Sequence, residues 1–281
     1  MRKWFPIVAV VTVLFLIGCQ GPKIRLFPSA EDPLQEYTLQ GDATGKVLVI
    51  HVRGTISDVP RRRIVSTRPS MVQEVVSQLR KAEKDAEIKA VLLKINSAGG
   101  SATASDILYN EIVAFKEKTA AKVVVAMMDV AASGGYYISL PADYILAHPT
   151  TITGSVGVLF IRPDVAGLMD KIGVEVEVSK TGINKDMGSP FRQATAEEKQ
   201  IIQNMIDRLG QRFLDRIAKH RRIDSQRLKD IATARIFMAA RHPKSFISLD
   251  DADHLLMNPK DSRYVGTLIA TWASKYIGTD P

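Results

Sequence analysis

The sequence predicts an α/β fold with a mainly parallel sheet, and three observations support this prediction. Short apolar runs at 47–52, 90–95 and 122–127 have the length of buried strands. Between them, apolar residues recur at helical spacing over roughly 69–84 and 103–118. Strands that alternate with helices form crossover units, in which the strands run parallel and ligand sites lie at their carboxyl ends. We therefore expect the chemistry to lie in the loops that follow these strands.

The composition favours a folded body and excludes several kinds of site. Of the 281 residues, 46% are hydrophobic and 24% are charged, a balance typical of globular domains. Lys and Arg outnumber Asp and Glu by 38 to 30, which gives a net charge of +8. Cys19 is the single cysteine, so the sequence excludes an intramolecular disulfide, a cysteine-based zinc site and an iron–sulfur cluster. We expect no bound metal or cofactor.

The first residues are typical of an export signal. Met1-Arg2-Lys3 is basic, and the apolar run 4–17 that follows is shorter than the ~20 residues that a membrane-spanning helix needs. Leu16-Ile17-Gly18-Cys19 resembles the bacterial lipobox, whose cysteine is acylated and becomes the N-terminus after cleavage. The resemblance implies lipidation of Cys19 and a membrane-anchored lipoprotein of the cell envelope, with its body outside the cytoplasm. An uncleaved anchor with an incidental thiol is the alternative.

A long helix is expected over residues 196–220, because Thr195-Ala-Glu-Glu198 has the pattern of a capping box. The many basic residues of this segment are interrupted by Asp207 and Asp215. Mixed charge is typical of a solvated helix face, and no nucleic-acid motif or interleaved aromatic residue accompanies it. We therefore expect no nucleic-acid partner.

Two loops of small residues follow the predicted strands. Ser133 lies between alanines and paired glycines. At a predicted strand-to-helix turn, a serine in this setting can expose its hydroxyl to a ligand. The second loop is Asn96-Ser-Ala-Gly-Gly100. We expect the N–H groups of Gly99, Gly100 and Gly134 to form an oxyanion hole for a reaction at Ser133. Close packing of backbone is the other explanation for each glycine pair.

A serine nucleophile needs a general base, and histidine is the commonest one. The sequence contains five histidines, none in a context that marks it as the partner of Ser133: His51, His148, His220, His242 and His254. The other solution is a lysine that burial keeps neutral. Lys185 is the candidate, because it lies in a loop of small and turn-forming residues at 181–190.

Four sequence blocks occur in a characteristic order: Lys94–Gly100, Ala131–Tyr137, Thr151–Val158 and Lys185–Pro190. Through these blocks, residues 46–236 resemble the signal peptide peptidase A family, serine-lysine peptidases on the Clp protease and crotonase fold of repeated ββα units. The resemblance implies that Ser133 is the nucleophile, Lys185 is the general base and Ser155 orients the lysine. The family usually has proline where this chain has Ala98. We expect alanine to loosen the oxyanion turn without removing its N–H donors.

The same resemblance implies a substrate and an assembly. The substrates would be signal-peptide remnants or other short apolar peptides, cleaved through an acyl-enzyme. The assembly would be a homo-oligomer, a tetramer or an octamer, in which neighbouring subunits complete each site. Two alternatives are a catalytically impaired lipoprotein scaffold and a crotonase-like acyl-CoA enzyme. Lys185 and the export signal argue against the second, because acyl-CoA is cytoplasmic.

The C-terminal residues depart from this family. Residues 238–277, especially 242–256, resemble the last strand, histidine loop and final helix of α/β-hydrolases, in which the residue matching His254 is the triad base. That base needs a Gly-x-Ser-x-Gly motif, which the sequence lacks, so we expect no catalytic role for His254. The predicted parts of the chain are a signal peptide at 1–18, a tether at 19–45, a peptidase domain at 46–237 and an atypical tail at 238–281.

Overall fold

The computed structural model describes residues 34–41, 45–62, 67–221, 223 and 225–238. The predicted signal peptide, Cys19, most of the tether and all but the first residue of the predicted tail lie outside these residues. The predictions on Cys19, His242 and His254 therefore lie outside the described residues. Within the described ranges, no helix combines the length and the hydropathy needed to cross a membrane.

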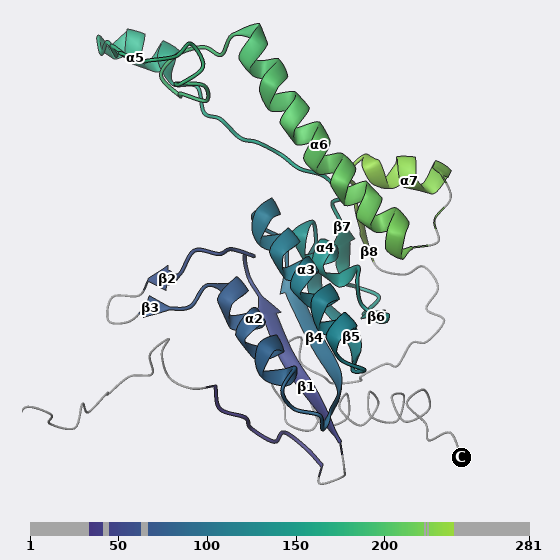
Figure 1. Ribbon diagram of the computed structural model, residues 1–281. Coiled ribbons are helices and arrows are strands. Elements are labelled where there is room, and N and C mark those ends of the chain that lie inside the picture. The colour runs from purple at the N-terminus through teal and green to yellow at the C-terminus, as the bar shows by residue number, and fades with distance from the viewer. Residues whose placement is uncertain (1–33, 42–44, 63–66, 222, 224, 239–281) are drawn as a thin grey trace, which may run out of the picture.

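A sheet forms the centre of the body (Figure 1). Its strands are β1 (Lys46–Arg53), β4 (Ile88–Ser97), β5 (Lys122–Ala132), β6 (Tyr144–Ala147), β7 (Ile152–Gly154) and β8 (Ile236–Met238). β4 pairs in parallel with β1 and with β5, and β5 pairs in parallel with β6 and, near its carboxyl end, with β7. β8 closes the sheet as an antiparallel partner of β7. The three predicted strands lie within β1, β4 and β5, which confirms the mainly parallel α/β fold.

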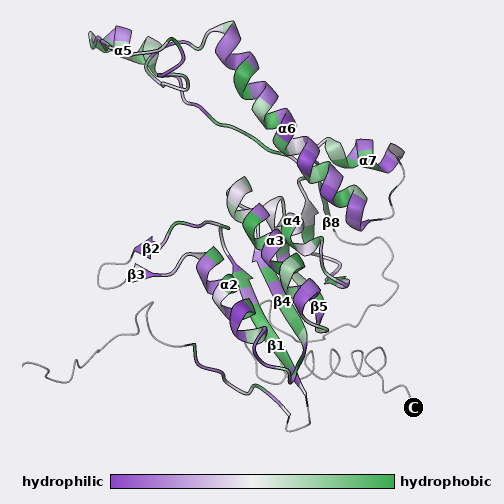
Figure 2. Ribbon diagram, in the orientation of Figure 1, coloured by the Kyte–Doolittle hydropathy of each residue, from purple (hydrophilic) through white to green (hydrophobic). Residues whose placement is uncertain are grey.

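Helices α2 (Met71–Ala82) and α3 (Ala102–Lys118) cover one face of this sheet (Figure 1). α2 begins at Ser70, whose hydroxyl accepts a hydrogen bond from the Gln73 N–H, while the Gln73 side chain accepts one from the Ser70 N–H. The apolar residues of both helices face the sheet (Figure 2). Side chains from the strands and the two helices form one buried cluster, which includes Ile50, Leu93, Val125, Leu79, Leu108 and Phe115. This core holds the carboxyl ends of β4 and β5 side by side.

Several short elements were not predicted from the sequence. A small antiparallel hairpin, β2 (Arg61–Arg62) and β3 (Thr67–Arg68), lies between β1 and α2. The helix expected after Ser133 is present as the short α4 (Gly134–Ser139), which begins two residues after the end of β5, so Ser133 alone forms the connection. β6, β7 and β8 have three or four residues each, too few to produce a readable period in the sequence.

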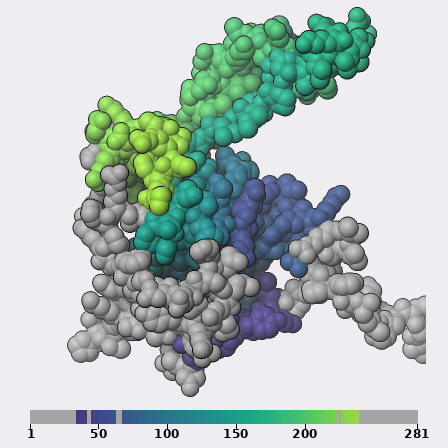
Figure 3. All heavy atoms as spheres, turned by 180° about the vertical axis from the view of Figure 1, so that it is seen from behind, coloured from purple at the N-terminus to yellow at the C-terminus, as the bar shows by residue number. Residues whose placement is uncertain are grey.

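The chain between β7 and α6 forms an arm that projects from the body. We define the arm as residues 159–195, which include α5 (Ala166–Ile172). Two opposite views show this segment and the first part of α6 extending away from the sheet (Figure 1, Figure 3). The predicted capping box and helix boundaries are confirmed, because α6 spans Ala196–His220 and Thr195 and Glu198 bond to each other as expected. α7 (Ser225–Ala232) follows α6.

The last part of α6 fastens the arm to the body. Phe213 and Ile217 are buried against Tyr109 of α3 and Tyr137 and Leu140 of the α4 region. The Phe213 and Tyr137 rings meet edge to face, with centroids 4.8 Å apart. Nearer its start, α6 is open to solvent, and Leu209 is 42% exposed. One end of α6 therefore packs on the short helix that follows Ser133, and the other end supports the arm.

We predict that Ile217→Ala destabilises the fold far more than Leu209→Ala, although both residues lie on α6. Ile217 is 0% exposed, and its truncation leaves a cavity that costs about 2–5 kcal/mol. The exposed Leu209 should cost less than about 0.5 kcal/mol. Urea denaturation of the two variants measures both free energies of unfolding. Equal losses would contradict the docking of α6 described here.

Candidate active site

Ser133 occupies a strained backbone turn between β5 and α4. Its φ angle is +51°, in a region that residues other than glycine rarely adopt. Two hydrogen bonds hold this turn: the Ser133 N–H donates to the Gly154 carbonyl at 2.8 Å, and the Ser133 carbonyl accepts from the Tyr137 N–H at 2.9 Å. The Ser133 hydroxyl forms no capping bond to α4 and is partly exposed. The Ser133 hydroxyl is therefore not used to cap α4, and the residue keeps partial access to solvent.

The Asn96–Gly100 loop packs directly against Ser133. A Cβ atom placed on Gly99 would lie 2.7 Å from the Gly134 nitrogen and 3.0 Å from the Ser133 Oγ, closer than side chains tolerate. Gly99 also has a φ of +104°, which favours glycine. A Cβ placed on Gly134 would lie 3.3 Å from the Gly100 nitrogen. The two predicted loops thus meet, and their contact depends on the absence of side chains.

The three glycine N–H groups differ in their hydrogen bonds. The Gly99 N–H donates to the Ser97 Oγ at 3.1 Å, so this group is already engaged. The N–H groups of Gly100 and Gly134 donate to no acceptor within the described part of the chain. Buried backbone N–H groups are nearly always paired, so the unpaired N–H of the buried Gly134, with that of the more exposed Gly100 nearby, offers a place for an anionic oxygen. With six residues, α4 is too short for its dipole to add much.

Neighbouring backbone holds the glycine loop in place. The Ile56 N–H donates to the Gly99 carbonyl, and the Ser101 N–H donates to the Ile56 carbonyl, both at 2.9 Å. The Ser97 hydroxyl donates to the Gly54 carbonyl at 2.6 Å. These bonds anchor both ends of the loop without using the Gly100 N–H. They also hold the loop around Ala98, the position at which the family that this sequence resembles usually has proline.

Lys185 does not reach Ser133 within one chain. It lies on the arm, in a turn where the Lys185 N–H donates to the Gly182 carbonyl at 3.1 Å. Its side chain is exposed and has no ion pair or hydrogen bond to another described residue. The segment between α5 and α6, which contains Lys185, lies at the end of α6 far from α4 (Figure 1). The described part of the chain therefore provides neither the contact nor the burial that a lysine base needs.

Ser155 lies nearer to Ser133 than Lys185 does. It follows Gly154, the residue whose carbonyl accepts the Ser133 N–H, and it has a φ of +51° of its own. The Ser155 N–H donates to the Arg235 carbonyl at 2.8 Å. No hydrogen bond joins Ser155 to Lys185 among the described residues. The Ser155 backbone is thus fixed beside the Ser133 turn, and its hydroxyl stays half-buried there.

None of the described histidines contacts Ser133. The His220 ring nitrogen lies 2.6 Å from the Tyr109 hydroxyl, and burial, together with nearby cations, lowers the pKa of His220. His148 contacts Thr150. His51 lies on β1, where burial lowers its pKa. Within the described ranges, no group of three or more His, Cys, Asp and Glu side chains is arranged to bind a metal.

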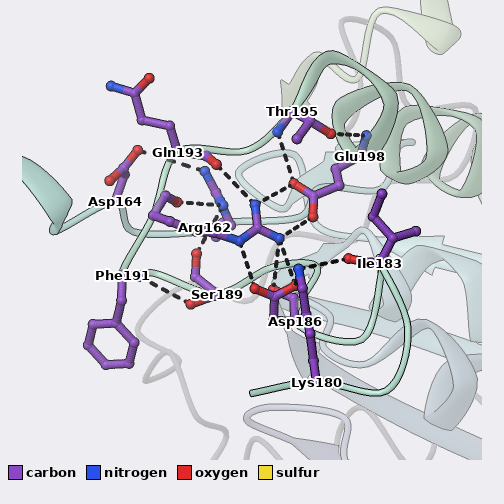
Figure 4. Close-up of polar contacts among 11 residues, drawn as sticks. Arg162, Asp164, Lys180, Ile183, Asp186, Ser189, Phe191, Gln193, Thr195 and Glu198 are labelled. Atoms are coloured by element: carbon purple, nitrogen blue, oxygen red, sulfur yellow. Dashed lines mark hydrogen bonds and ion pairs between the residues drawn. The ribbon is translucent and has the colours of Figure 1, made fainter. Parts of the chain in front are cut away.

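A cluster of ion pairs lies on the arm around Asp186, the residue after Lys185 (Figure 4). Arg192 pairs with both Asp186 and Glu198, and Lys180 also pairs with Asp186. Hydrogen bonds from Arg192 and from the Thr195 N–H lower the pKa of Glu198 to about 2. Those from Arg192 and Lys180 hold the pKa of Asp186 well below its ordinary value. Sequence reasoning missed this cluster, because nothing in a linear sequence shows which charges pair.

We predict that Arg192→Gln lowers thermal stability in a pH-dependent way. Carboxylates whose pKa values are lowered by folding stabilise the protein above their ordinary pKa values, and this stabilisation is lost as pH falls. For Glu198 the loss falls between 4.5 and about 2. The difference in melting temperature between wild type and Arg192→Gln should be largest near pH 7 and shrink below pH about 4. Arg208→Gln, at an exposed position without an ion pair among the described residues, is the control. A difference independent of pH would contradict the assignment.

Two family models match the chain. The model of the Clp protease family matches residues 60–153, and the model described as Peptidase family S49 matches residues 115–244. The first covers β4, β5 and the Ser133 turn, and together with the parallel sheet it identifies an α/β fold of the Clp and crotonase type.

Relatives extend the match over most of the chain. A protein of Enterococcus faecium named "Putative signal peptide peptidase SppA" is 33% identical over 213 residues, which cover 76% of this chain and 62% of that protein. A protein of Synechocystis named as a protease is 30% identical over 227 residues, which cover 81% of this chain and 77% of that protein. A Methanocaldococcus jannaschii protein, also named as a protease, is 41% identical over 155 residues, which cover 55% of this chain and 49% of that protein. The chain belongs to peptidase family S49, the signal peptide peptidase A family. It spans less than two thirds of the Enterococcus and Methanocaldococcus relatives.

Proposed function

We propose that this protein is a serine endopeptidase in which Ser133 is the nucleophile and Lys185 is the general base. The observation that carries the proposal is the turn at Ser133, where a partly exposed serine lies beside the N–H groups of Gly100 and Gly134, which are unpaired among the described residues. A nucleophile next to preorganised donors is the arrangement that acyl transfer requires. Membership of peptidase family S49 supports the same reaction.

The proposed reaction proceeds through an acyl-enzyme. The neutral amine of Lys185 accepts the hydroxyl proton as the Ser133 oxygen attacks the peptide carbonyl. The N–H groups of Gly100 and Gly134 stabilise the negative oxygen that forms, and one such donor contributes about 3–4 kcal/mol in the transition state. The protonated lysine then donates its proton to the departing amine, and water, deprotonated by the same lysine, hydrolyses the acyl-enzyme.

A second copy of the chain is proposed to supply the lysine. Lys185 is exposed and remote from Ser133 in its own chain, whereas a lysine base must be desolvated and in contact with the serine. The arm also exposes large apolar side chains, which are Leu159, Phe160, Ile161, Leu168, Ile172, Val174, Val176, Val178, Ile183 and Phe191. Exposed apolar residues gathered on one segment are typical of a protein–protein interface. A homo-oligomer, a tetramer or an octamer, would bury these residues and bring Lys185 to a neighbour's Ser133, where Ser155 orients it.

The proposed substrates are signal-peptide remnants and other short apolar peptides. The name of the Enterococcus relative supports the first class. Lipidation at Cys19 would hold the enzyme at a membrane of the cell envelope, the place where such remnants are released.

Hydrolysis of a fluorogenic apolar peptide tests the proposal. We predict that Ser133→Ala and Lys185→Ala each lower kcat at least about 1,000-fold, since each removes a group that acts in the bond-breaking steps. Ser77→Ala on α2 and Lys84→Ala just after α2 are the matched controls, because both residues are exposed and lie outside the arm. Both controls should retain the wild-type rate.

Three results would contradict this function. Equal rates in wild type and both site variants would exclude the serine–lysine mechanism. No hydrolysis by any of them would favour a lipoprotein scaffold. Thioester hydrolysis of acyl-CoA in place of peptide hydrolysis would favour the crotonase-like alternative.

A further inference from the structure

The turn that contains Lys185 is held by the residue that follows it in sequence. Asp186 is 12% exposed, and its carboxylate accepts hydrogen bonds from two cations of the arm. Lys185 itself has no such partner among the described residues. Whatever fixes Asp186 therefore fixes the backbone from which the Lys185 side chain extends. This makes the partners of Asp186 candidates for a role in positioning the base.

We propose that Arg192 is a positioning residue for Lys185: its guanidinium ties Asp186 to Glu198 at the start of α6 and so fixes the turn that presents the lysine. The proposal rests on the proposed function, because it acts through the base assigned there. Arg192 itself touches no reacting atom, and its effect on the rate passes through Lys185.

All five N–H donors of Arg192 are used. Its Nε donates to one oxygen of Asp186 at 2.8 Å and its Nη2 to the other at 2.9 Å. Nη2 also donates to Glu198, Nη1 donates to the second Glu198 oxygen at 2.9 Å, and Nη1 bonds the Gln193 carbonyl at 3.0 Å. Because both edges of the planar guanidinium are hydrogen-bonded, Arg192 fixes the relative orientation of Asp186 and Glu198 as well as the distance between them. Lysine at this position keeps the charge but loses this geometry.

The other end of this connection is rigid. Glu198 is 2% exposed, and its carboxylate accepts the Thr195 N–H at 2.9 Å within the capping box that begins α6. The arginine thus fastens the Lys185 turn to the first turn of a helix of 25 residues, whose far end is buried against the body. Movement of the turn relative to α6 would break several of these bonds together.

A second set of bonds closes the turn around Lys185. The Lys180 ammonium donates to the Asp186 carboxylate at 2.6 Å and to the Ile183 carbonyl at 2.9 Å (Figure 4). Arg162 donates to the Ser189 carbonyl at 3.0 Å on the following residues. Lys180 and Arg192 together balance the charges of Asp186 and Glu198. The carboxylate next to Lys185 is therefore already paired and does not compete for the lysine.

The decisive experiment measures whether the effect of Arg192 depends on Lys185. The probe is an activated nitrophenyl ester of an apolar peptide, whose leaving group needs no protonation, so that Lys185→Ala keeps a measurable residual rate. We expect Arg192→Gln to lower kcat about 10- to 100-fold with KM within about twofold, since small misplacement of a catalytic group costs this much. Arg192→Lys should lie between Arg192→Gln and wild type. In the Lys185→Ala background, Arg192→Gln should have no further effect.

The controls separate positioning from loss of the fold. Arg208→Gln should keep wild-type kcat, and melting temperatures recorded for every variant show which ones are folded at the assay temperature. Should Arg192→Gln not fold, Arg192→Lys takes its place in both backgrounds. An equal loss with and without Lys185, or wild-type kcat in a folded Arg192→Gln, would overturn the proposal. Equal rates in wild type and Lys185→Ala would instead refute the proposed function itself.

Discussion

The turn at Ser133 is the constraint on which the rest of the site depends. A serine with a positive φ angle is held there because its N–H bonds to β7, its carbonyl bonds into α4, and Gly99 leaves room beside its hydroxyl. Such strain persists only where surrounding structure enforces it. The parallel pairing of β4 and β5 brings the glycine loop and the Ser133 turn to the same edge of the sheet. The fold therefore places the proposed nucleophile beside two backbone donors.

The proposed base, Lys185, is organised in a different way. Lys185 lies on an arm that leaves the body, and the ion pairs of Arg192 fix its turn to α6 rather than to the Ser133 site. The turn is thus ordered while the lysine side chain remains exposed. The arm also exposes apolar residues that could form a subunit interface. An ordered turn on such an arm can place Lys185 in the site of another copy at a smaller entropic cost than a flexible loop. Preorganisation of this kind lowers the cost of assembling the site.

The sequence predicted the parts of this structure that depend on local patterns. Apolar runs located β1, β4 and β5, and the Thr195–Glu198 capping box located α6, because both signals lie in consecutive residues. Small residues at the ends of strands located Ser133 and its glycines. The turn-forming residues around Lys185 made it a candidate and the family resemblance gave it the role of base, but its separation from Ser133 within one chain depends on the path of the arm. The pairing of Arg192 and the engaged N–H of Gly99 depend on tertiary geometry that no local pattern records.

The central claim is that one copy's Ser133 works with another copy's Lys185, and complementation between two inactive variants tests it most directly. Ser133→Ala and Lys185→Ala chains are refolded together, so that mixed oligomers form, and peptide hydrolysis is compared with that of each variant refolded alone. In a random mixture, about one quarter of the sites would combine an intact serine with an intact lysine from the neighbour. The account predicts that the mixture regains roughly that fraction of wild-type activity. Mixed oligomers that remain as inactive as the separate variants would contradict it.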